Sequence, residues 1–269
     1  MTLFLKQEEM WKRPLSKRAK SHLEDGKPTI THWFGNLAYV VAMFVVKILW
    51  RAKFTGREQL RAFDGKSGVI LCCNHSSYLD VAFLYLAARF RQWVRILGRE
   101  NLFQNAHGLA GQILSRVGAI PIARDQADTK GIKRAVRILK DGEVLGIYPE
   151  GTRRGKSGRI PHITPGLALI AQMSKAPVLP MAIVNAGKIK QKGQRIRFPR
   201  VYVRFGKPIS LKDFDHIDKS VRKEAFCWYV MRQVHALAQD CQASEVDMKV
   251  LFPEDRDFSE LFENESVSS

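Results

Sequence analysis

Short apolar runs rich in β-branched residues alternate with longer helical patterns along most of this chain. We predict strands over residues 52–55, 69–73, 93–97, 119–122, 144–148, 178–184 and 200–205. We predict helices over residues 78–90, 101–117, 128–140, 165–175 and 220–239. Parallel neighbours need a long crossover connection, which a helix provides, so this alternation favours a mostly parallel sheet with helices on both faces. The expected fold class is therefore α/β, with one soluble domain over residues 51–245.

Residues 1–50 differ from this pattern, because a basic stretch leads into the most hydrophobic part of the chain, residues 33–50. As a helix, that part would be about 27 Å long, slightly less than the roughly 30 Å hydrocarbon core of a bilayer. Both flanks are basic, with Arg51, Lys53 and Arg57 on the C-terminal side, so a full crossing would oppose the positive-inside preference. We therefore expect an N-terminal hydrophobic membrane-associating helix that makes the protein monotopic or peripheral at the cytoplasmic face of the cell membrane. A single crossing and a helix buried within the protein are the alternatives.

The net charge of +18 is unevenly distributed along the chain. Residues 208–269 carry −6, so residues 1–207 carry +24. A segment this basic suits anionic partners, such as phosphate esters, an acidic membrane surface, an acidic carrier protein or nucleic acid. We expect the acidic residues 246–269 to form a tail that frays from the domain.

The four cysteines, Cys72, Cys73, Cys227 and Cys241, form no CxxC pair, and the sequence has no His and Cys spacing typical of a metal site. We expect reduced cysteines in a cytosolic setting and no metal. Residues 151–157 resemble a phosphate-binding loop, but their glycines are one residue too close together for that motif. The sequence also lacks the Gly-x-Ser-x-Gly elbow of a serine hydrolase.

The turn after the second predicted strand carries a histidine and an aspartate five residues apart, His75 and Asp80. In open α/β folds, ligands bind at the edge where strands hand over to helices. The spacing lets the Asp80 carboxylate fold back onto one imidazole nitrogen and leave the other nitrogen facing outward. A histidine held in one tautomer by a carboxylate can act as a general base. A surface histidine with a helix-capping aspartate is the alternative interpretation for this pair taken alone.

Arg99, Arg124, Glu150 and Arg153 also follow predicted strands. Because the carboxyl ends of parallel strands meet at the same edge of a sheet, we expect these side chains to lie near His75. Guanidinium groups bind phosphate bidentately, and a histidine base removes the proton of a hydroxyl. This combination indicates a substrate that carries both a hydroxyl and a phosphate monoester.

Four sequence blocks occur in the order found in glycerolipid acyltransferases. The blocks are Asn-His-x4-Asp over residues 74–80, a Gly-led segment ending in Arg over 118–124, Tyr-Pro-Glu-Gly-Thr-Arg over 148–153, and an apolar Pro-containing strand over 177–183. The chain thus resembles this family, which includes the 1-acyl-glycerol-3-phosphate (lysophosphatidate) acyltransferases, over roughly residues 50–210. It departs from the family pattern at Tyr148, where Phe is usual, at Arg154, where Ser is common, at Arg99, where Lys is frequent, and at Pro121. These departures bear on acceptor preference more than on reaction type.

The resemblance implies that the chain is an enzyme that moves a fatty acyl group onto the sn-2 hydroxyl of 1-acyl-glycerol-3-phosphate, giving phosphatidate. His75 would remove the proton from that hydroxyl, and Asp80 would hold the imidazole. The acyl donor would be a thioester of coenzyme A or of an acyl carrier protein. The reaction would need no cofactor and no metal.

The remaining residues of the family blocks are implied to bind substrates. Arg124 and Arg153 would hold the phosphate of the acceptor, and Arg99 is a further candidate. Glu150 would orient either the acceptor or the loop of the third block. The resemblance also places Gly151 and Thr152 in that loop among the substrate-binding residues, and residues 177–183, together with the hydrophobic helix, would guide the acyl chain.

Three alternatives stay open from the sequence. Within the family, the acceptor could be glycerol-3-phosphate, another lysophospholipid or a glycolipid. A thioesterase would use water in place of the acceptor hydroxyl at His75. A nucleic-acid-binding module is suggested by the positive charge and the basic residues of 195–204, but no aromatic platform for base stacking accompanies them, so we expect no nucleic-acid partner.

Overall fold

The computed structural model describes residues 32–63, 67–88, 92–104, 109–122, 128–151, 153–154, 160–191 and 193–262. Within these ranges, a single seven-stranded sheet has the order β1-β7-β6-β2-β5-β3-β4. The strands are β1 Lys53–Thr55, β2 Val69–Cys73, β3 Val94–Arg99, β4 Ala119–Ile122, β5 Val144–Ile147, β6 Val178–Val184 and β7 Tyr202–Phe205. Strand β2 therefore lies at the centre of the sheet.

The sheet is mostly parallel, as the alternation of strands and helices predicted. Strands β6, β2, β5, β3 and β4 all run in one direction, while β7 pairs antiparallel with β6. Strand β1 runs parallel to β7 and so opposes the other five. The described residues between β6 and β7 contain no α-helix that could return the chain for a parallel pairing, which accounts for the reversal.

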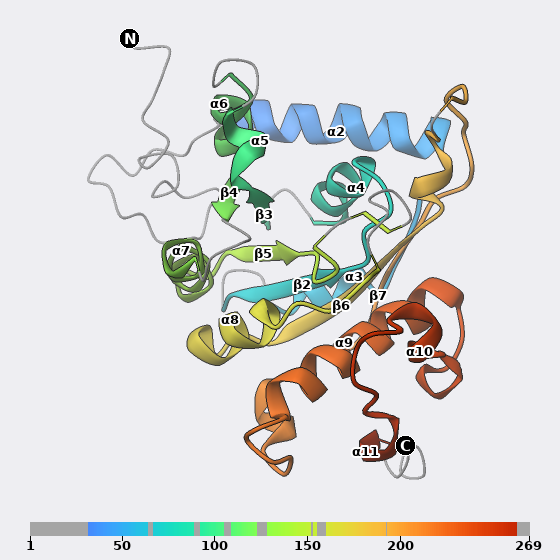
Figure 1. Cartoon of the computed structure of the whole chain (residues 1–269). Coiled ribbons are helices and arrows are strands. Elements are labelled where there is room, and N and C mark those ends of the chain that lie inside the picture. The colour runs from blue at the N-terminus through green and yellow to red at the C-terminus, as the bar shows by residue number, and fades with distance from the viewer. Residues whose placement is uncertain are drawn as a thin grey trace.

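The helices lie on both faces of the sheet (Figure 1). The helices are α2 His32–Leu49, α3 Arg57–Arg61, α4 Leu79–Ala87, α5 Glu100–Gln104, α6 Leu109–Arg116, α7 Thr129–Lys140, α8 Gly166–Ser174, α9 Arg222–Gln239, α10 Met248–Leu251 and α11 Ser259–Phe262. In Figure 1, α2 and α4 lie above the sheet, whereas α8 and α9 lie below it. The side chains of Cys72 and Cys73 fall in the hydrophobic clusters of opposite faces, as expected for adjacent residues of a strand.

Two predicted helices show how local signals succeed or fail. Helix α7 begins after Asp128, whose carboxylate accepts a hydrogen bond from the Gly131 backbone N–H at 2.8 Å, and it ends before Gly142, which has a φ of +84°. The single helix predicted over residues 101–117 is wrong, because the structure has two helices, α5 and α6, in this region. Residues 105–108 between them lie outside the described residues.

The expectation that the C-terminal residues fray is wrong for residues 246–262. Val246, Met248, Phe252, Phe258 and Phe262 are buried in the same hydrophobic cluster as α8 and α9. Their apolar side chains pack on aromatic residues of the preceding segments; the ring centroid of Phe262, for example, lies 5.8 Å from that of Trp228. The expectation of fraying rested on the acidic residues of this segment, and the buried apolar side chains lie between them. Residues 263–269 lie outside the described residues.

Helix α2 packs along one side on the rest of the protein. The Tyr39 hydroxyl donates to the Leu86 carbonyl at 3.3 Å and accepts from the Arg57 guanidinium at 2.9 Å, and Val46 is buried. Most of the other apolar side chains of the helix are exposed. Within the described part of the chain, no helix combines the length and the hydropathy that a bilayer crossing requires.

Candidate active site

The turn between β2 and α4 is fastened to the neighbouring strand β6. The side-chain amide of Asn74 donates to the Ile183 carbonyl at 3.1 Å, and its oxygen accepts from the Ile183 N–H at 2.8 Å. Where the backbone pairing of β2 ends, the Asn74 side chain thus takes the place of a backbone partner for β6. His75 is thereby fixed at the carboxyl edge of the central strand, the position at which α/β folds bind ligands.

His75 and Asp80 are in direct contact, as their spacing suggested. The distance from His75 Nδ1 to Asp80 Oδ2 is 3.0 Å, and Asp80 is fully buried. The same carboxylate oxygen accepts the backbone N–H groups of Ser76 at 2.6 Å and Ser77 at 2.7 Å. Because a carboxylate only accepts hydrogen bonds, Nδ1 carries the proton of the neutral ring and Nε2 has a free lone pair for the pocket.

The ring of Tyr148 packs against that of His75 at a tilt, a contact that the sequence did not predict. The two ring centroids are 4.4 Å apart with an interplanar angle of 30°. The Tyr148 hydroxyl is buried and has no hydrogen-bond partner among the described residues. Burial raises the pKa of this phenol well above its usual value, and nearby Cys73, Asp80 and Tyr85 raise it further. The group is therefore a neutral hydrogen-bond donor beside the imidazole, and the only signal in the sequence was a Tyr where Phe is usual.

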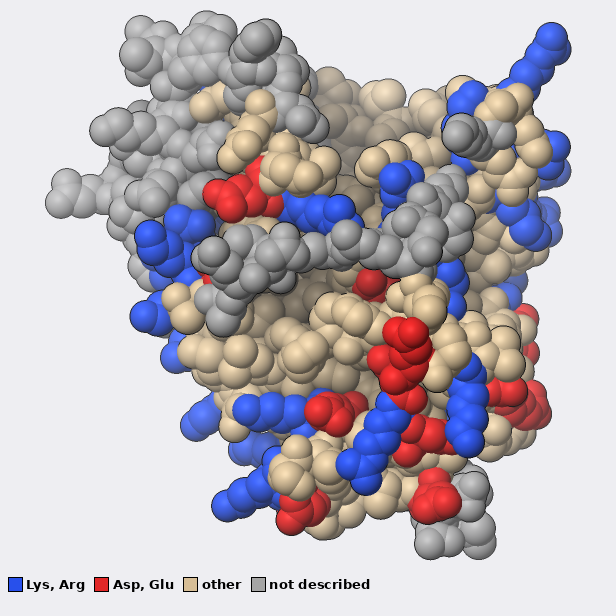
Figure 2. All heavy atoms as spheres, viewed as in Figure 1, with Lys and Arg blue, Asp and Glu red and all other residues tan. Residues whose placement is uncertain are grey.

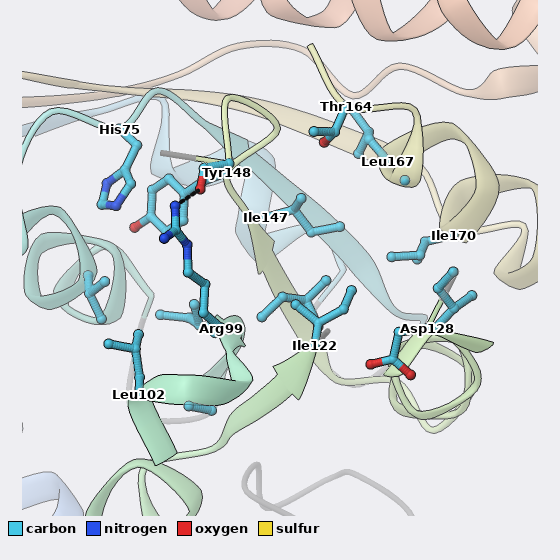
Figure 3. Close-up of a pocket in the computed structure, with 18 of the residues that line it drawn as sticks. His75, Arg99, Leu102, Ile122, Asp128, Ile147, Tyr148, Thr164, Leu167 and Ile170 are labelled. Atoms are coloured by element: carbon cyan, nitrogen blue, oxygen red, sulfur yellow. Dashed lines mark hydrogen bonds between the residues drawn. The ribbon is translucent and has the colours of Figure 1, made fainter. Parts of the chain in front are cut away.

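Two of the predicted arginines reach the same pocket as His75. The Arg99 guanidinium donates to the Gly151 carbonyl at 3.4 Å (Figure 3), and Gly151 has a φ of +60° that favours glycine. The guanidinium of Arg153 lies 3.6 Å from the ring centroid of Tyr78. His75, Arg99, Gly151 and Arg153 all line this pocket. Arg124 and Thr152, the other predicted substrate-binding residues, lie outside the described residues.

Glu150 lies away from the pocket that His75 lines. It is buried and forms an ion pair with Arg154, with 3.0 Å between Glu150 Oε2 and Arg154 Nε. His235 of α9 approaches the other carboxylate oxygen at 3.7 Å. Of the two roles expected for Glu150, orientation of the third-block loop fits this geometry, whereas contact with a substrate in the pocket does not.

Arg154 links the third-block loop to two distant parts of the chain. Its backbone N–H donates to the His75 carbonyl at 2.8 Å, and its guanidinium donates to the Leu251 carbonyl at 2.8 Å and lies 4.7 Å from the ring centroid of Phe252. The C-terminal segment thus supports the loop that carries His75. Sequence reasoning recorded Arg154 only as a departure from the usual Ser.

The pocket is a cavity of about 1000 Å³ that extends from His75 into the interior. Figure 3 shows His75, Tyr148 and Arg99 at one end and Ile122, Ile170 and Asp128 towards the other. Much of the lining is aliphatic, from Val81, Leu97, Leu102, Leu114, Ile122, Ile147, Leu167 and Ile170. Strand β6 does not contribute to this lining, so the expectation that residues 177–183 guide an acyl chain is not met by this pocket. The described residues contain no cluster of three or more His, Cys, Asp or Glu side chains that could hold a metal ion.

Comparisons with known proteins relate this chain to acyltransferases. The family profile described as Acyltransferase matches residues 51–184. The chain is 31% identical over 173 residues to a 1-acyl-sn-glycerol-3-phosphate acyltransferase of Bacillus subtilis (strain 168), a match that covers 64% of this chain and 81% of that protein. A protein of the same name from Streptococcus pneumoniae (strain ATCC BAA-255 / R6) is 28% identical over 63% of this chain and 61% of its own length. The crystal structure of the 1-acyl-sn-glycerophosphate acyltransferase from Thermotoga maritima has the same fold, with a TM-score of 0.52 and 18% identity over 79% of this chain and 88% of that one.

Proposed function

Because this chain belongs to the acyltransferase family, we propose that it transfers a fatty acyl group from a thioester to the sn-2 hydroxyl of 1-acyl-glycerol-3-phosphate, giving phosphatidate. The names of its relatives support this acceptor. The observation that carries the proposal is the His75–Asp80 pair at the polar end of a long apolar pocket, beside Arg99 and Arg153. Such a pocket suits a substrate with a charged head and an aliphatic chain.

In the proposed reaction, His75 Nε2 removes the proton from the acceptor hydroxyl while that oxygen attacks the carbonyl carbon of the thioester. The negative charge of Asp80 stabilises the imidazolium that forms, and the backbone N–H groups of Ser76 and Ser77 keep the carboxylate in place. When the tetrahedral intermediate collapses, the carbon–sulfur bond breaks and the imidazolium returns its proton to the leaving thiolate. The products are the ester and a free thiol.

The phosphate of the acceptor is proposed to bind the arginines at the mouth of the pocket. The guanidinium of Arg153 stacks on the exposed ring of Tyr78. In this position its N–H groups would point past the ring edge and could donate hydrogen bonds to a phosphate. Arg99 is held by the Gly151 carbonyl on the other side of the third-block loop. We retain Arg124 and Thr152 as proposed substrate contacts on the basis of the family blocks.

The acyl chain of the donor is proposed to enter the apolar part of the pocket. Its aliphatic lining places a fatty chain next to His75, where the thioester must be attacked. The Tyr148 hydroxyl would then donate to the oxygen that becomes negative in the tetrahedral intermediate, because it has no protein partner among the described residues. Either coenzyme A or an acyl carrier protein can carry this chain.

The lipid substrates are proposed to reach the site from the cytoplasmic leaflet, on which α2 would rest. The exposed apolar side chains of this helix are Trp33, Leu37, Val40, Val41, Phe44, Val45, Ile48 and Leu49. An amphipathic arrangement of this kind favours a helix that lies in the membrane interface, and Lys47 near its end favours anionic lipid.

A panel assay tests the proposed reaction. Purified protein is incubated with radiolabelled acyl-coenzyme A or acyl carrier protein and, in parallel, with lysophosphatidate, glycerol-3-phosphate, lysophosphatidylglycerol or no acceptor. We expect labelled phosphatidate from lysophosphatidate and little thioester consumption without an acceptor. If the thioester is consumed equally fast with and without an acceptor, the protein is a thioesterase. If label is transferred only to another acceptor, that acceptor replaces lysophosphatidate as the proposed substrate.

A further inference from the structure

A second exposed feature lies beside α2, the loop from residue 185 to residue 201 that joins β6 to β7, here called the β6–β7 loop. Figure 1 shows this loop next to the C-terminal end of α2, with its tip reaching the same outer level as the helix. Residues 195–200 of the loop read Arg-Ile-Arg-Phe-Pro-Arg, so cationic and apolar residues alternate. The acyl-transfer mechanism makes no use of these residues.

Direct contacts tie the β6–β7 loop to the end of α2. The ring centroids of Trp50 and Phe198 are 5.8 Å apart, and the Trp50 indole N–H donates to the Arg197 carbonyl at 3.2 Å. The Arg51 guanidinium donates to the Phe198 carbonyl at 3.0 Å. The loop is therefore joined to the residues that directly follow α2, and the two elements border one surface.

The β6–β7 loop presents apolar side chains to solvent. Ile196 is 59% exposed and Phe198 is 49% exposed. Two large apolar side chains at adjoining alternate positions, continuous with the exposed residues of α2, form a patch of the kind that marks an interaction site. Isolated exposed apolar residues would need no such explanation, but these adjoin an apolar helix face.

The charged residues of the β6–β7 loop are all positive. Lys188, Arg195, Arg197 and Arg200 are exposed, and the sequence contains no Asp or Glu between Glu150 and Asp213. Figure 2 shows Lys and Arg side chains gathered at the upper right, over this loop. Such a surface is complementary to an anionic partner.

The β6–β7 loop also begins next to the candidate active site. Its first turn, η2 Ala186–Lys188, packs against the turn that carries His75, so closely that a Cβ atom on Gly187 would lie 3.2 Å from the Ser76 side chain. A partner bound to the loop is therefore adjacent to the edge at which His75 acts.

We propose that the β6–β7 loop is a second lipid-binding element that inserts Ile196 and Phe198 into the interface of an anionic phospholipid bilayer while Arg195, Arg197 and Arg200 bind lipid phosphates. This inference rests on the proposed function, since a lipid substrate must come from such a bilayer. Apolar insertion combined with arginine is typical of interfacial membrane binding, whereas an exposed isoleucine offers no face for base stacking. With α2 as the other contact, the loop prevents rotation about the helix axis and keeps the His75 edge against the lipid.

Vesicle sedimentation tests the proposal on the full-length protein. The variant Ile196→Ser/Phe198→Ser is compared with wild type on vesicles of phosphatidylglycerol and phosphatidylcholine, and Val250→Ser is the matched control, because Val250 is 76% exposed on α10 across the sheet from α2. We expect the double variant to weaken partitioning by about tenfold or more and the control to leave it unchanged. The variant Arg195→Gln/Arg197→Gln should weaken binding by about tenfold on anionic vesicles alone, with Lys130→Gln/Lys133→Gln on α7 as its control.

Hydrogen exchange shows directly whether the loop touches lipid, even if α2 dominates the affinity. We expect anionic vesicles to slow exchange of the backbone amides of residues 193–198, and not of the amides of α10. Protection of α2 without protection of the loop would overturn the proposal. Sequence-selective binding of nucleic acid that is lost in the loop variants would overturn it as well.

A soluble assay separates this inference from the proposed function. With a short-chain lysophosphatidate and a short-chain acyl-coenzyme A, both below their critical micelle concentrations and without vesicles, the loop variants should keep the wild-type rate. A wild-type protein that transfers no acyl group to any acceptor would refute the proposed function, while the vesicle and exchange results would still decide whether the loop binds lipid.

Discussion

At the scale of single residues, Arg153 and Arg154 are adjacent but face different surroundings. Arg153 stacks on exposed Tyr78 at the mouth of the pocket, whereas Arg154 pairs with buried Glu150. The two positions therefore separate substrate binding from support of the loop.

Replacing Arg153 with alanine should raise the KM for lysophosphatidate by about 10- to 100-fold, because a charge-assisted contact with phosphate is lost. The KM for the acyl thioester should stay near its wild-type value. Steady-state kinetics with each substrate varied in turn measure both constants. An increase confined to the thioester KM would show that Arg153 binds the donor.

Replacing Tyr148 with phenylalanine removes only the buried hydroxyl that has no partner among the described residues. We expect kcat to fall roughly tenfold or more, because a donor to the developing oxyanion is lost. Thermal stability should be equal or higher, since deleting an unpaired buried polar group costs nothing in the folded state. Kinetics and thermal unfolding of the same sample test this pair of effects. A fall in stability with unchanged kcat would assign Tyr148 a structural role only.

At the scale of structural elements, the third-block loop depends on a buried ion pair and on the C-terminal segment. Replacing Arg154 with methionine leaves the Glu150 carboxylate buried without its partner, and we expect a loss of about 2–4 kcal/mol in the free energy of unfolding. Adding Glu150→Gln removes the uncompensated charge and should restore part of that loss. Denaturant unfolding of the single and double variants measures the coupling. Equal stability of wild type and Arg154→Met would contradict the stabilising role assigned to the Glu150–Arg154 ion pair.

The C-terminal helices should contribute to stability in the same way as the core of the sheet. Phe252 is 1% exposed and contacts both Arg154 and His235, so Phe252→Ala should cost about 3–5 kcal/mol in the free energy of unfolding. The neighbouring exposed Val250 provides the control, since Val250→Ala should change stability by less than about 0.5 kcal/mol. If Phe252→Ala changes the free energy of unfolding as little as the control, the C-terminal segment is frayed and not packed on the domain.

Elements with a strong local pattern were predictable from the sequence. Strands β2, β4 and β6 begin and end where their apolar runs do. For β2 and β6 the reason is that a strand buried on both faces needs continuous apolar residues. The spacing of His75 and Asp80 likewise anticipated their contact, which is local. The division between α5 and α6, in contrast, was not recovered from helical periodicity.

Features that depend on distant contacts were not predictable. The burial of Glu150 depends on Arg154 and His235, and the latter lies on α9, far along the chain. The packing of Phe252, Phe258 and Phe262 depends on surfaces of α8 and α9 that exist only once the sheet has formed. Hydrophobic residues spaced among acidic ones give no helical or strand period from which to infer such packing.

At the scale of the whole molecule, the fold brings three surfaces next to one another. The exposed face of α2, the β6–β7 loop and the turn that carries His75 adjoin one another, and the pocket leads inward from that turn. The aromatic cluster of the C-terminal segment lies on the other face of the sheet. This segment contacts the third-block loop through the hydrogen bond from Arg154 to the Leu251 carbonyl. This arrangement suits an enzyme that takes an amphiphile from a surface and reacts its hydroxyl at the boundary.

The most direct measurement is the rate of phosphatidate formation by purified His75→Ala protein under saturating lysophosphatidate and acyl thioester, beside wild type. Circular dichroism and thermal unfolding establish that the variant is folded. We expect kcat to fall by about 10²–10⁴-fold or more, because the acceptor hydroxyl loses the base that His75, held by Asp80, is proposed to provide. A folded His75→Ala protein that forms phosphatidate at the wild-type rate would contradict the role assigned to this histidine.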